Sequence, residues 1–422
     1  MHTQIYMIYG GCFNLRLNDG AFIQLFNYAT ISVLRDQKGY WKTCFRGSSF
    51  RVASLLILGL FIWSTLLEQH NKEKLLKWSL GVNISSKLTT CENEKRPLGS
   101  ESLPKGIVVN TSNLERRPLW GLPEKTNSSR SLFAVAVGIK QKINVDKMVR
   151  KFLESGFVVM LFHYDGIVDE WKGFEWSSKV IHVWFAKRFL HPDIVAEYNY
   201  IFLWDEDLGV ENFNPRRYLS IVKDEGFEIS QPALDSKLSE VHHLITTRSR
   251  RSKVHTRAYK SDGKGVQCDD TSSSPPCTGW IEVMAPVFSK AAWRCVWYMI
   301  QNDLIHAWGL DIRLGYCAQG DRTKKIGVVD AEYIVHYGLP TLGEPNKAKL
   351  VSIGYSTSEE KKEVASHRPR AINQRVEVRR QSYNEYRVFK RRWIRAAEMD
   401  ECWTDRYPDE NLLNHTSAWP NM

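Results

Sequence analysis

Short apolar runs and amphipathic segments alternate along the middle of this chain. Residues 132–137 (LFAVAV), 157–162 (FVVMLF) and 200–204 (YIFLW) are unbroken apolar runs, which predict strands buried on both faces. Between the first two runs, residues 145–155 carry apolar side chains at helical spacing, and Gly156 ends this predicted helix. Strands that alternate with helices favour an α/β domain with a mainly parallel sheet flanked by helices.

The alternation continues less regularly toward the C-terminus. We expect further strands at 179–184, 227–231, 280–286 and 325–329, and helices at 192–198, 215–224 and 291–308. The tail is basic, and residues 369–395 predict a solvated helix that packs over the domain. Contact of that helix with a membrane surface or a nucleic acid is the alternative.

One apolar run near the start predicts a membrane anchor. Residues 52–67 (VASLLILGLFIWSTLL) carry no charge and show no amphipathic face, which argues against a helix buried in a soluble domain. As a helix the run covers roughly 24 Å, short against a bilayer core of about 30 Å, and short spans suit the thinner membranes of the early secretory pathway. The basic residues that precede the run favour a cytosolic N-terminus. They are Arg35, Lys38, Lys42, Arg46 and Arg51.

These features predict a type II organisation. We expect a cytosolic tail, a signal anchor, a luminal stem, a catalytic domain and a basic helical extension, at residues 1–51, 52–67, 68–131, 132–345 and 346–422. The stem contains acceptor sequons at Asn83, Asn110 and Asn127, and Asn414 begins another near the end. Their clustering agrees with a glycoprotein of the secretory pathway.

The cysteines and the net charge narrow the class of protein. A luminal domain permits disulfides, and spacing makes Cys268–Cys277 and Cys295–Cys317 candidate pairs. No CxxC pair occurs, which argues against a structural zinc site.

The net charge of +11 suits nucleic acid, an anionic membrane face or anionic substrates. The basic stretch 243–260 predicts a solvated loop; a flap over a diphosphate and an RNA-binding patch are the alternatives.

An acidic triplet follows the apolar run 200–204. Asp205 and Asp207 are two residues apart, so on an extended backbone they point the same way. Two such carboxylates bind a hard divalent cation, Mg²⁺ or Mn²⁺, which can in turn hold a diphosphate. An acidic turn after an ordinary core strand is the alternative.

Several other residues are expected to share the same sheet edge. The first two predicted strands run into Gly138 and into Tyr164-Asp165. Since ligands of open α/β sheets gather at the carboxyl ends of strands, we expect a nucleotide site there. The predicted substrate-binding residues are Gly138, Tyr164, Asp165, Trp204, Trp308 and Gly309.

Two residues further along the chain are candidates for the chemistry. Asp311 follows Trp308-Gly309 after the long predicted helix and can serve as a general base toward an acceptor hydroxyl. A helix-capping role is the alternative. His336 can complete a cation site with Asp205 and Asp207, although a lone histidine often lies satisfied in a core.

Four strings carry a resemblance to a known family. They are residues 202–209 (FLWDEDLG), 284–289 (MAPVFS), 302–311 (NDLIHAWGLD) and 327–330 (GVVD) leading to His336. In these the chain resembles the plant family of domain-of-unknown-function 707, whose members are often labelled lysine-ketoglutarate reductase trans-splicing related. No GxGxxG follows a strand, so nothing here favours a reductase.

The same residues are similar to glycosyltransferases of the GT-A fold. That resemblance implies a cation bound by Asp205 and Asp207, with His336 as third ligand and Asp311 as base. It also implies a nucleotide-sugar donor, a glycan acceptor, and a single-pass type II protein of the Golgi membrane. The identity of the donor stays open, because no base pocket is evident.

Three functions follow from these observations. The first is a metal-dependent glycosyltransferase of the secretory pathway. The second is an inactive GT-A-like module that binds glycans or partner proteins. The third is a nuclear RNA-associated protein, although only Tyr259 interleaves the basic stretch and we expect no nucleic-acid partner.

Overall fold

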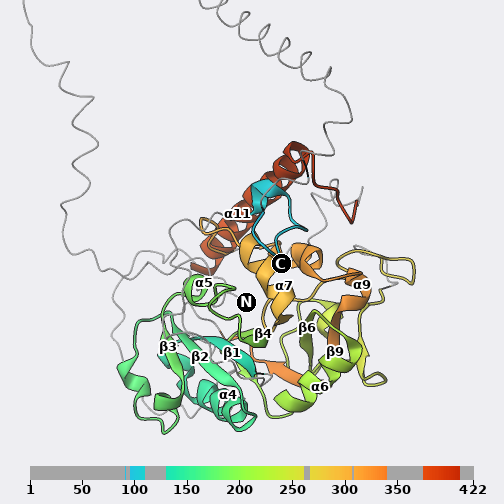
Figure 1. Ribbon diagram of the computed structural model, residues 1–422. Coiled ribbons are helices and arrows are strands. Elements are labelled where there is room, and N and C mark those ends of the chain that lie inside the picture. Colours follow the sequence, from blue (N-terminus) through green and yellow to red (C-terminus); the bar gives the residue numbers. More distant parts are fainter. Residues whose placement is uncertain are drawn as a thin grey trace, which may run out of the picture. The chain divides into compact units, whose positions relative to one another are not determined.

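The computed structural model describes residues 91, 96–109, 130–260, 267–306, 308–339 and 374–408 (Figure 1). The described residues from 96 onward belong to one compact unit. The predicted anchor at 52–67 and the four sequons lie outside the described residues. Among the residues that are described, no helix is both long enough and apolar enough to cross a bilayer.

The first half of the sheet is parallel. Its strands are β1 (Arg130–Val137), β2 (Val158–His163), β3 (Ile181–Val183) and β4 (Tyr198–Trp204). β1 lies between β2 and β4 and is parallel to both, while β3 extends the sheet beyond β2. The helix α4 (Lys142–Glu154) connects β1 to β2. The strands and the helix expected from the sequence in this half are therefore confirmed.

The second half of the sheet is mixed. β8 (Val287–Ser289) is antiparallel to both β4 and β6 (Ile229–Leu234), and β6 is parallel to β9 (Ile326–His336). The short strands β5 (Leu208–Gly209) and β7 (Val254–His255) are antiparallel to β9. Within the described residues the order is β3-β2-β1-β4-β8-β6-β9-β5, with β7 beside β9.

The expected mainly parallel sheet is thus a mixed one. Its parallel and antiparallel pairings are equally frequent among the described strands. The difference arises because β8 enters between β4 and β6 in the opposite direction, and because the short strands β5 and β7 are antiparallel to β9. An apolar run shows that a strand is buried on both faces, but it does not show its direction.

The helices differ from the sequence prediction at two places. The helix predicted at 192–198 is absent, and α5 (Ala186–Phe189) precedes it. The helix predicted at 291–308 is α7 (Lys290–Met299), which ends early. The buried Lys187 ammonium donates hydrogen bonds to the carbonyls of Trp297 and Ile300, so a side chain from α5 satisfies the end of α7.

The remaining helices are short, apart from one. They are α6 (Pro215–Glu225), α8 (Leu310–Arg313), α9 (Arg322–Lys325) and α11 (Gln374–Met399). Single 3₁₀ turns occur at Lys105–Ile107 (η1), Ile139–Gln141 (η2), Asp169–Trp171 (η3), Ser177–Lys179 (η4), Leu244–Thr246 (η5) and Leu314–Cys317 (η6). The prediction of helix 215–224 is confirmed by α6, which starts at the N-cap Asn214.

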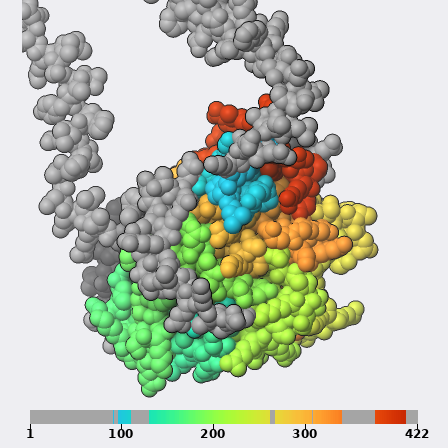
Figure 2. All heavy atoms as spheres, viewed as in Figure 1, coloured from blue at the N-terminus to red at the C-terminus, as the bar shows by residue number. Residues whose placement is uncertain are grey.

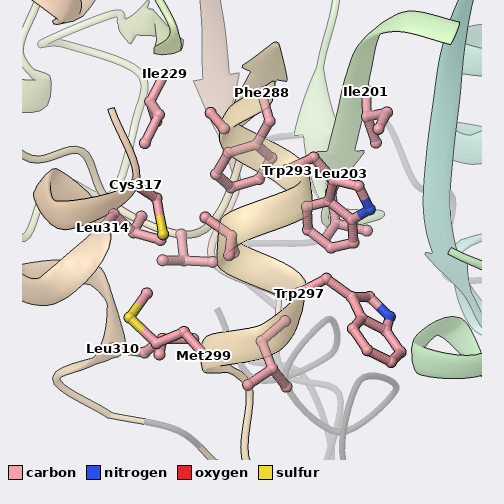
Figure 3. Packing of buried hydrophobic residues seen from close by; sticks show 14 of the residues in the cluster. Ile201, Leu203, Ile229, Phe288, Trp293, Trp297, Met299, Leu310, Leu314 and Cys317 are labelled. Atoms are coloured by element: carbon pink, nitrogen blue, oxygen red, sulfur yellow. The ribbon is translucent and has the colours of Figure 1, made fainter. Parts of the chain in front are cut away.

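Hydrophobic side chains fill both faces of the sheet. Alternate residues of β1 belong to different cores, Leu132 and Ala134 to one and Phe133 and Val135 to the other. α7 covers the first core, where Trp293 lies beside Phe288 and Leu203, and Trp297 lies further along the helix (Figure 3). α4 and α6 cover the second core, which is rich in aromatic rings.

The cysteine pairs expected from spacing are confirmed. Cys268 is bonded to Cys277, and Cys295 to Cys317. The second bond ties α7 to the turn η6 that follows α8, and therefore ties it to the segment that contains Asp311.

The C-terminal helix α11 packs on this unit. Its buried side includes Phe389 and Trp393, whereas Val376 and Tyr383 are exposed. η1 lies along α11 (Figures 1 and 2), and Lys105 donates its amide to the Asp400 carboxylate just beyond the helix. The predicted packing of a helix over the domain is therefore found in the last turns of α11.

Candidate functional site

The acidic triplet lies where β4 ends, and all three of its carboxylates are buried. The backbone on either side of Asp205–Asp207 is fixed by neighbouring segments. The Asp205 amide donates to the Met284 carbonyl at 2.9 Å, and the Tyr337 amide donates to the Asp207 carbonyl at 3.1 Å. The triplet is therefore held between the segment before β8 and the end of β9, not in an exposed turn.

Asp207 and His336 form a buried pair. His336 Nε2 is 3.6 Å from Asp207 Oδ2, which also accepts the Leu339 amide at 2.9 Å. Burial alone would raise the pKa of Asp207, but its interactions with His336 and Leu339 lower that pKa below its ordinary value. Burial alone would lower the pKa of His336, but Asp207 and the Glu240 carbonyl raise it.

Asp205 belongs to the same electrostatic group. Burial, together with the nearby charge of Asp207, raises the pKa of Asp205, and His336 opposes this shift. The structure thus brings together the three residues predicted to bind a cation. His336 Nδ1 lies 2.9 Å from the Glu240 carbonyl, a contact that directs Nε2 toward Asp207.

This group suits a cation that shares its ligands with a substrate. Within the described part of the chain, no three His, Cys, Asp or Glu side chains are close enough to enclose a metal by themselves. Mg²⁺ typically takes one or two carboxylates and completes its shell with phosphate oxygens and water. Asp205 and Asp207 supply carboxylates of this kind, whereas imidazole is not a usual Mg²⁺ ligand, so the cation role of His336 stays a prediction.

Glu206, the middle acid, points to the other predicted residues. Its carboxylate accepts hydrogen bonds from the Gly138 amide at 2.7 Å and from the Tyr164 hydroxyl at 2.5 Å. Burial raises the pKa of Glu206 well above its ordinary value, although these two bonds oppose the shift. A Cβ on Gly138 would lie 2.2 Å from the Tyr164 hydroxyl, so a larger residue there would displace the Tyr164 side chain.

Asp165 also lies at this edge, because its Oδ2 accepts the Ile139 amide at 2.7 Å. Gly138, Tyr164 and Asp165 are therefore brought together, as predicted. Trp204 is not part of this group: its ring is buried among Phe133, Phe152 and Phe213. This placement gives Trp204 a packing role and does not support the substrate contact predicted for it.

Asp311 is buried in the first turn of α8. Burial raises the pKa of Asp311 to about 6, and hydrogen bonds from the backbone, including the Ile312 amide at 2.9 Å, oppose the shift. Asp311 is the second residue of the helix, and its N-cap is Gly309, so the alternative of an N-capping aspartate is not found.

Gly309 has a structural reason to be glycine. Its φ is 82°, and a Cβ there would lie 2.1 Å from the ring of Tyr386 in α11. The half-buried Trp308 precedes it. The predicted substrate-binding pair Trp308-Gly309 is thus where α11 approaches the Asp311 segment.

Sequence reasoning missed Glu282. The strand expected at 280–286 is an extended segment with a turn, and the observed strand β8 begins only at Val287. Glu282 is 0% exposed, and neither carboxylate oxygen has a hydrogen-bond partner within the described residues. An acid inside the apolar run WIEVMAP was the available signal, because buried glutamates are rare unless they are paired.

Glu282 is coupled to the residues described above. Burial raises its pKa to about 7; the charges of Asp311 and Asp205 act in the same direction, and His336 acts against them. The segment of Glu282 is also bonded to the acidic triplet, because the Met284 carbonyl accepts the Asp205 amide.

The basic stretch 243–260 is held by contacts with β9 and with residue 269. Arg248 donates to the Asp330 carbonyl at 3.0 Å and stacks 3.6 Å from the ring centre of Tyr333. His255 Nδ1 is 2.8 Å from Asp330 Oδ2, and Arg257 donates to the Asp269 carbonyl at 2.7 Å. These contacts give Arg248 and Arg257 a structural role. They provide no support for a flap over a diphosphate or for an RNA-binding patch.

Comparison with families and curated proteins gave one match. A family model described as "Protein of unknown function (DUF707)" matches residues 94–399. Among curated proteins, none matches this chain significantly.

Solved structures with some likeness include TarS of S. aureus. Its 1–349 fragment matches with a TM-score of 0.31 and 6% identity, covering 48% of this chain and 59% of that one. The fragment in complex with UDP matches with a TM-score of 0.29 and 9% identity, covering 49% of this chain and 59% of that one. The fragment in complex with UDP-GlcNAc matches with a TM-score of 0.29 and 9% identity, covering 51% of this chain and 60% of that one. This chain thus spans about three fifths of the length of the fragment.

Proposed function

Because this chain belongs to the DUF707 family, whose description assigns no activity, we propose its function from the site itself. The protein transfers a sugar from a nucleotide-sugar donor to a hydroxyl group of a glycan acceptor, with a divalent cation. The single observation that carries this proposal is the buried pair of Asp207 and His336, 3.6 Å apart, with the buried carboxylate of Asp205 two residues before Asp207 at the end of β4.

Burying such a group of acids lowers the stability of the folded protein. Buried carboxylates are normally paired or bound to metal, and Asp205 and Glu282 have raised pKa values that reflect burial beside like charges. Perturbed acids that gather at one edge of an α/β sheet mark candidate active sites. A purely structural core has no use for them.

The residues divide between the two substrates. Asp205, Asp207 and His336 would hold the cation, which when bound would neutralise charge on the departing diphosphate. Glu206 fixes Tyr164 and the Gly138 backbone on the donor side of the sheet edge.

Asp311 takes the proton of the acceptor hydroxyl. Its burial raises its pKa to about 6, so near neutral pH it is ionised and yet more basic than an exposed aspartate. Along the chain the acid pair comes first, then the base and then the histidine, in the order that the resemblance to GT-A glycosyltransferases implies.

We further propose that the protein is a single-pass type II protein of the Golgi membrane. The support is the apolar run at 52–67 and the sequons that follow it. The disulfides Cys268–Cys277 and Cys295–Cys317 agree with an oxidising compartment.

The test begins with ligand binding. The full chain is screened by thermal shift against UDP-, GDP- and CMP-sugars with Mn²⁺, and release of the nucleotide is then measured. We expect stabilisation by at least one donor together with slow donor hydrolysis, which is lowered at least about 10²-fold in Asp207→Asn. Asp224→Asn, an exposed acid on α6, is the matched control.

Two results would decide against transfer. Donor binding without any turnover would favour the second candidate function, a module that binds glycans or partners. Equal turnover in Asp207→Asn and the wild type would remove the proposed role of the cation site.

A further inference from the structure

Glu282 stands apart from the other acids of the site. Glu206 and Asp207 each accept hydrogen bonds from described groups, whereas both oxygens of Glu282 are buried and accept none within the described residues. A buried carboxylate without partners costs several kcal/mol by general estimates, so its retention requires an explanation. One explanation is a ligand that supplies the missing donors.

The position of Glu282 is fixed by its backbone. Its amide donates to Gln231 Oε1 at 2.8 Å, and Gln231 is a fully buried residue of β6. Two residues later, the Met284 carbonyl accepts the Asp205 amide. The side chain thus starts from a segment that is bonded to β6 on one side and to the acidic triplet on the other.

The charges that act on Glu282 locate it within the site. Asp205 and His336 belong to the proposed cation side, and Asp311 is the proposed base. In a direct displacement, the transferred sugar lies between the diphosphate and the attacking hydroxyl. The segment of Glu282 is bonded to the Asp205 backbone, on the side where the diphosphate would be held, and the sugar is attached to that diphosphate.

We propose that Glu282 binds the transferred sugar, its carboxylate accepting hydrogen bonds from two neighbouring hydroxyl groups of the ring. This inference rests on the proposed function and extends it to the sugar itself. An ionised carboxylate only accepts hydrogen bonds, and two adjacent hydroxyls supply one donor for each oxygen. The donor sugar is therefore one with free vicinal hydroxyls.

Another buried glutamate offers a matched control. Glu332 accepts the Asn214 amide at 2.6 Å and pairs with Arg217 Nε at 2.9 Å, so both of its oxygens have partners inside the fold. Glu282→Gln and Glu332→Gln make the same chemical change at two buried positions. Their effects should differ in sign.

The first measurement needs no ligand. At pH 8.5, above the pKa of about 7, the Glu282 carboxylate is mostly ionised; in the ligand-free protein E282Q then removes an uncompensated charge and is expected to raise Tm by about 2–4 °C, whereas E332Q should lower it. A fall in Tm of E282Q, or loss of its folded form, would show that the fold itself uses this carboxylate, and would overturn the proposal.

The second measurement compares each sugar nucleotide with its sugar-free nucleotide. In E282Q, Kd for Mn²⁺ and for UDP, GDP or CMP should be unchanged, while Kd for the accepted sugar nucleotide should rise about tenfold or more. E332Q should bind both as the wild type does.

Each other outcome has a distinct meaning. Weaker Mn²⁺ binding in E282Q would make Glu282 a cation ligand and overturn the sugar role. An unchanged Kd for the sugar nucleotide would also overturn it, while leaving the proposed function intact. If the wild type binds no sugar nucleotide of the panel, the proposed function fails, and this inference fails with it.

Discussion

At the residue scale, burial gives Asp311 a distinctive pH dependence. The pKa of about 6 means that Asp311 is protonated, and so inactive as a base, below about pH 6. We expect the rate of transfer to rise with pH through this value and then to level off. Kinetics between pH 5 and 8 on the full chain would measure it.

Asp311→Asn is the complementary test. The amide cannot take a proton, so kcat should fall by about 10²–10⁴-fold, and the acidic limb of the profile should disappear. A variant that keeps that limb would show that another group titrates there.

Sequence reasoning placed some residues of the candidate site correctly, missed one and misplaced another. Asp205 and Asp207 were singled out because they follow an apolar run that marks a strand end, whereas His336 was favoured through the resemblance to GT-A glycosyltransferases; the structure places His336 beside Asp207. Glu282 was missed because the run around it suggested a strand, and an acid in a strand is easily assigned to its solvent-facing side. Trp204 was predicted to contact the substrate, and it directly precedes Asp205. Side chains alternate along β4, however, and the Trp204 ring lies in the aromatic core that α4 and α6 cover.

At the element scale, α11 supports the segment that carries Asp311. Glu385 accepts the His306 amide at 2.6 Å and lies 3.2 Å from His306 Nδ1, and Arg392 pairs with Asp303 at 2.7 Å. These contacts link the C-terminal extension to the chain that runs from α7 to α8. The extension is therefore a structural part of the site.

Glu385→Ala tests this support. We expect a loss of about 1.5–3 kcal/mol in the free energy of unfolding, together with a lower kcat and an unchanged Kd for Mn²⁺. Glu377→Ala removes an exposed pair with Arg380 on the same helix and should change none of these quantities. Equal behaviour of the two variants would remove the supporting role of α11.

The strand pair β7–β9 contains a pH-dependent contact. Burial alone would lower the pKa of His255, but the hydrogen bond and charge of Asp330, with the Ile245 carbonyl, raise it. Because the folded pKa is raised, the stability that it adds is complete below the unfolded value of about 6.5 and is lost as pH rises through the folded value.

His255→Gln should therefore destabilise the protein more at pH 6 than at pH 9. Denaturant unfolding of the wild type and the variant at both values would measure the difference. A difference that grows with pH would contradict the assigned ion pair.

The elements found from the sequence are those defined by local pattern. β1, α4 and β2 follow from continuous apolar runs and a clear helical period. β8 has only three residues, and its place is set by pairing with β4 and β6, which are distant in sequence. The early end of α7 depends on Lys187, which likewise comes from a remote segment.

At the scale of the whole molecule, the proposed type II arrangement makes a direct prediction. A C-terminally tagged protein should colocalise with Golgi markers, and an enzyme that removes N-linked glycans should increase its mobility on a gel. Replacing Asn83, Asn110 and Asn127 together by Gln should remove most of that shift. Nuclear signal without a glycan shift would favour the RNA-associated alternative.

The placement of β8 has a consequence for biosynthesis. β4 and β6 leave the ribosome before β8, yet β8 lies between them in the finished sheet. Until β8 has been translated, the β4 edge in the nascent chain lacks its neighbour, and exposed strand edges invite mispairing. The β4 edge therefore needs shielding from other strands until translation of β8 lets the sheet close.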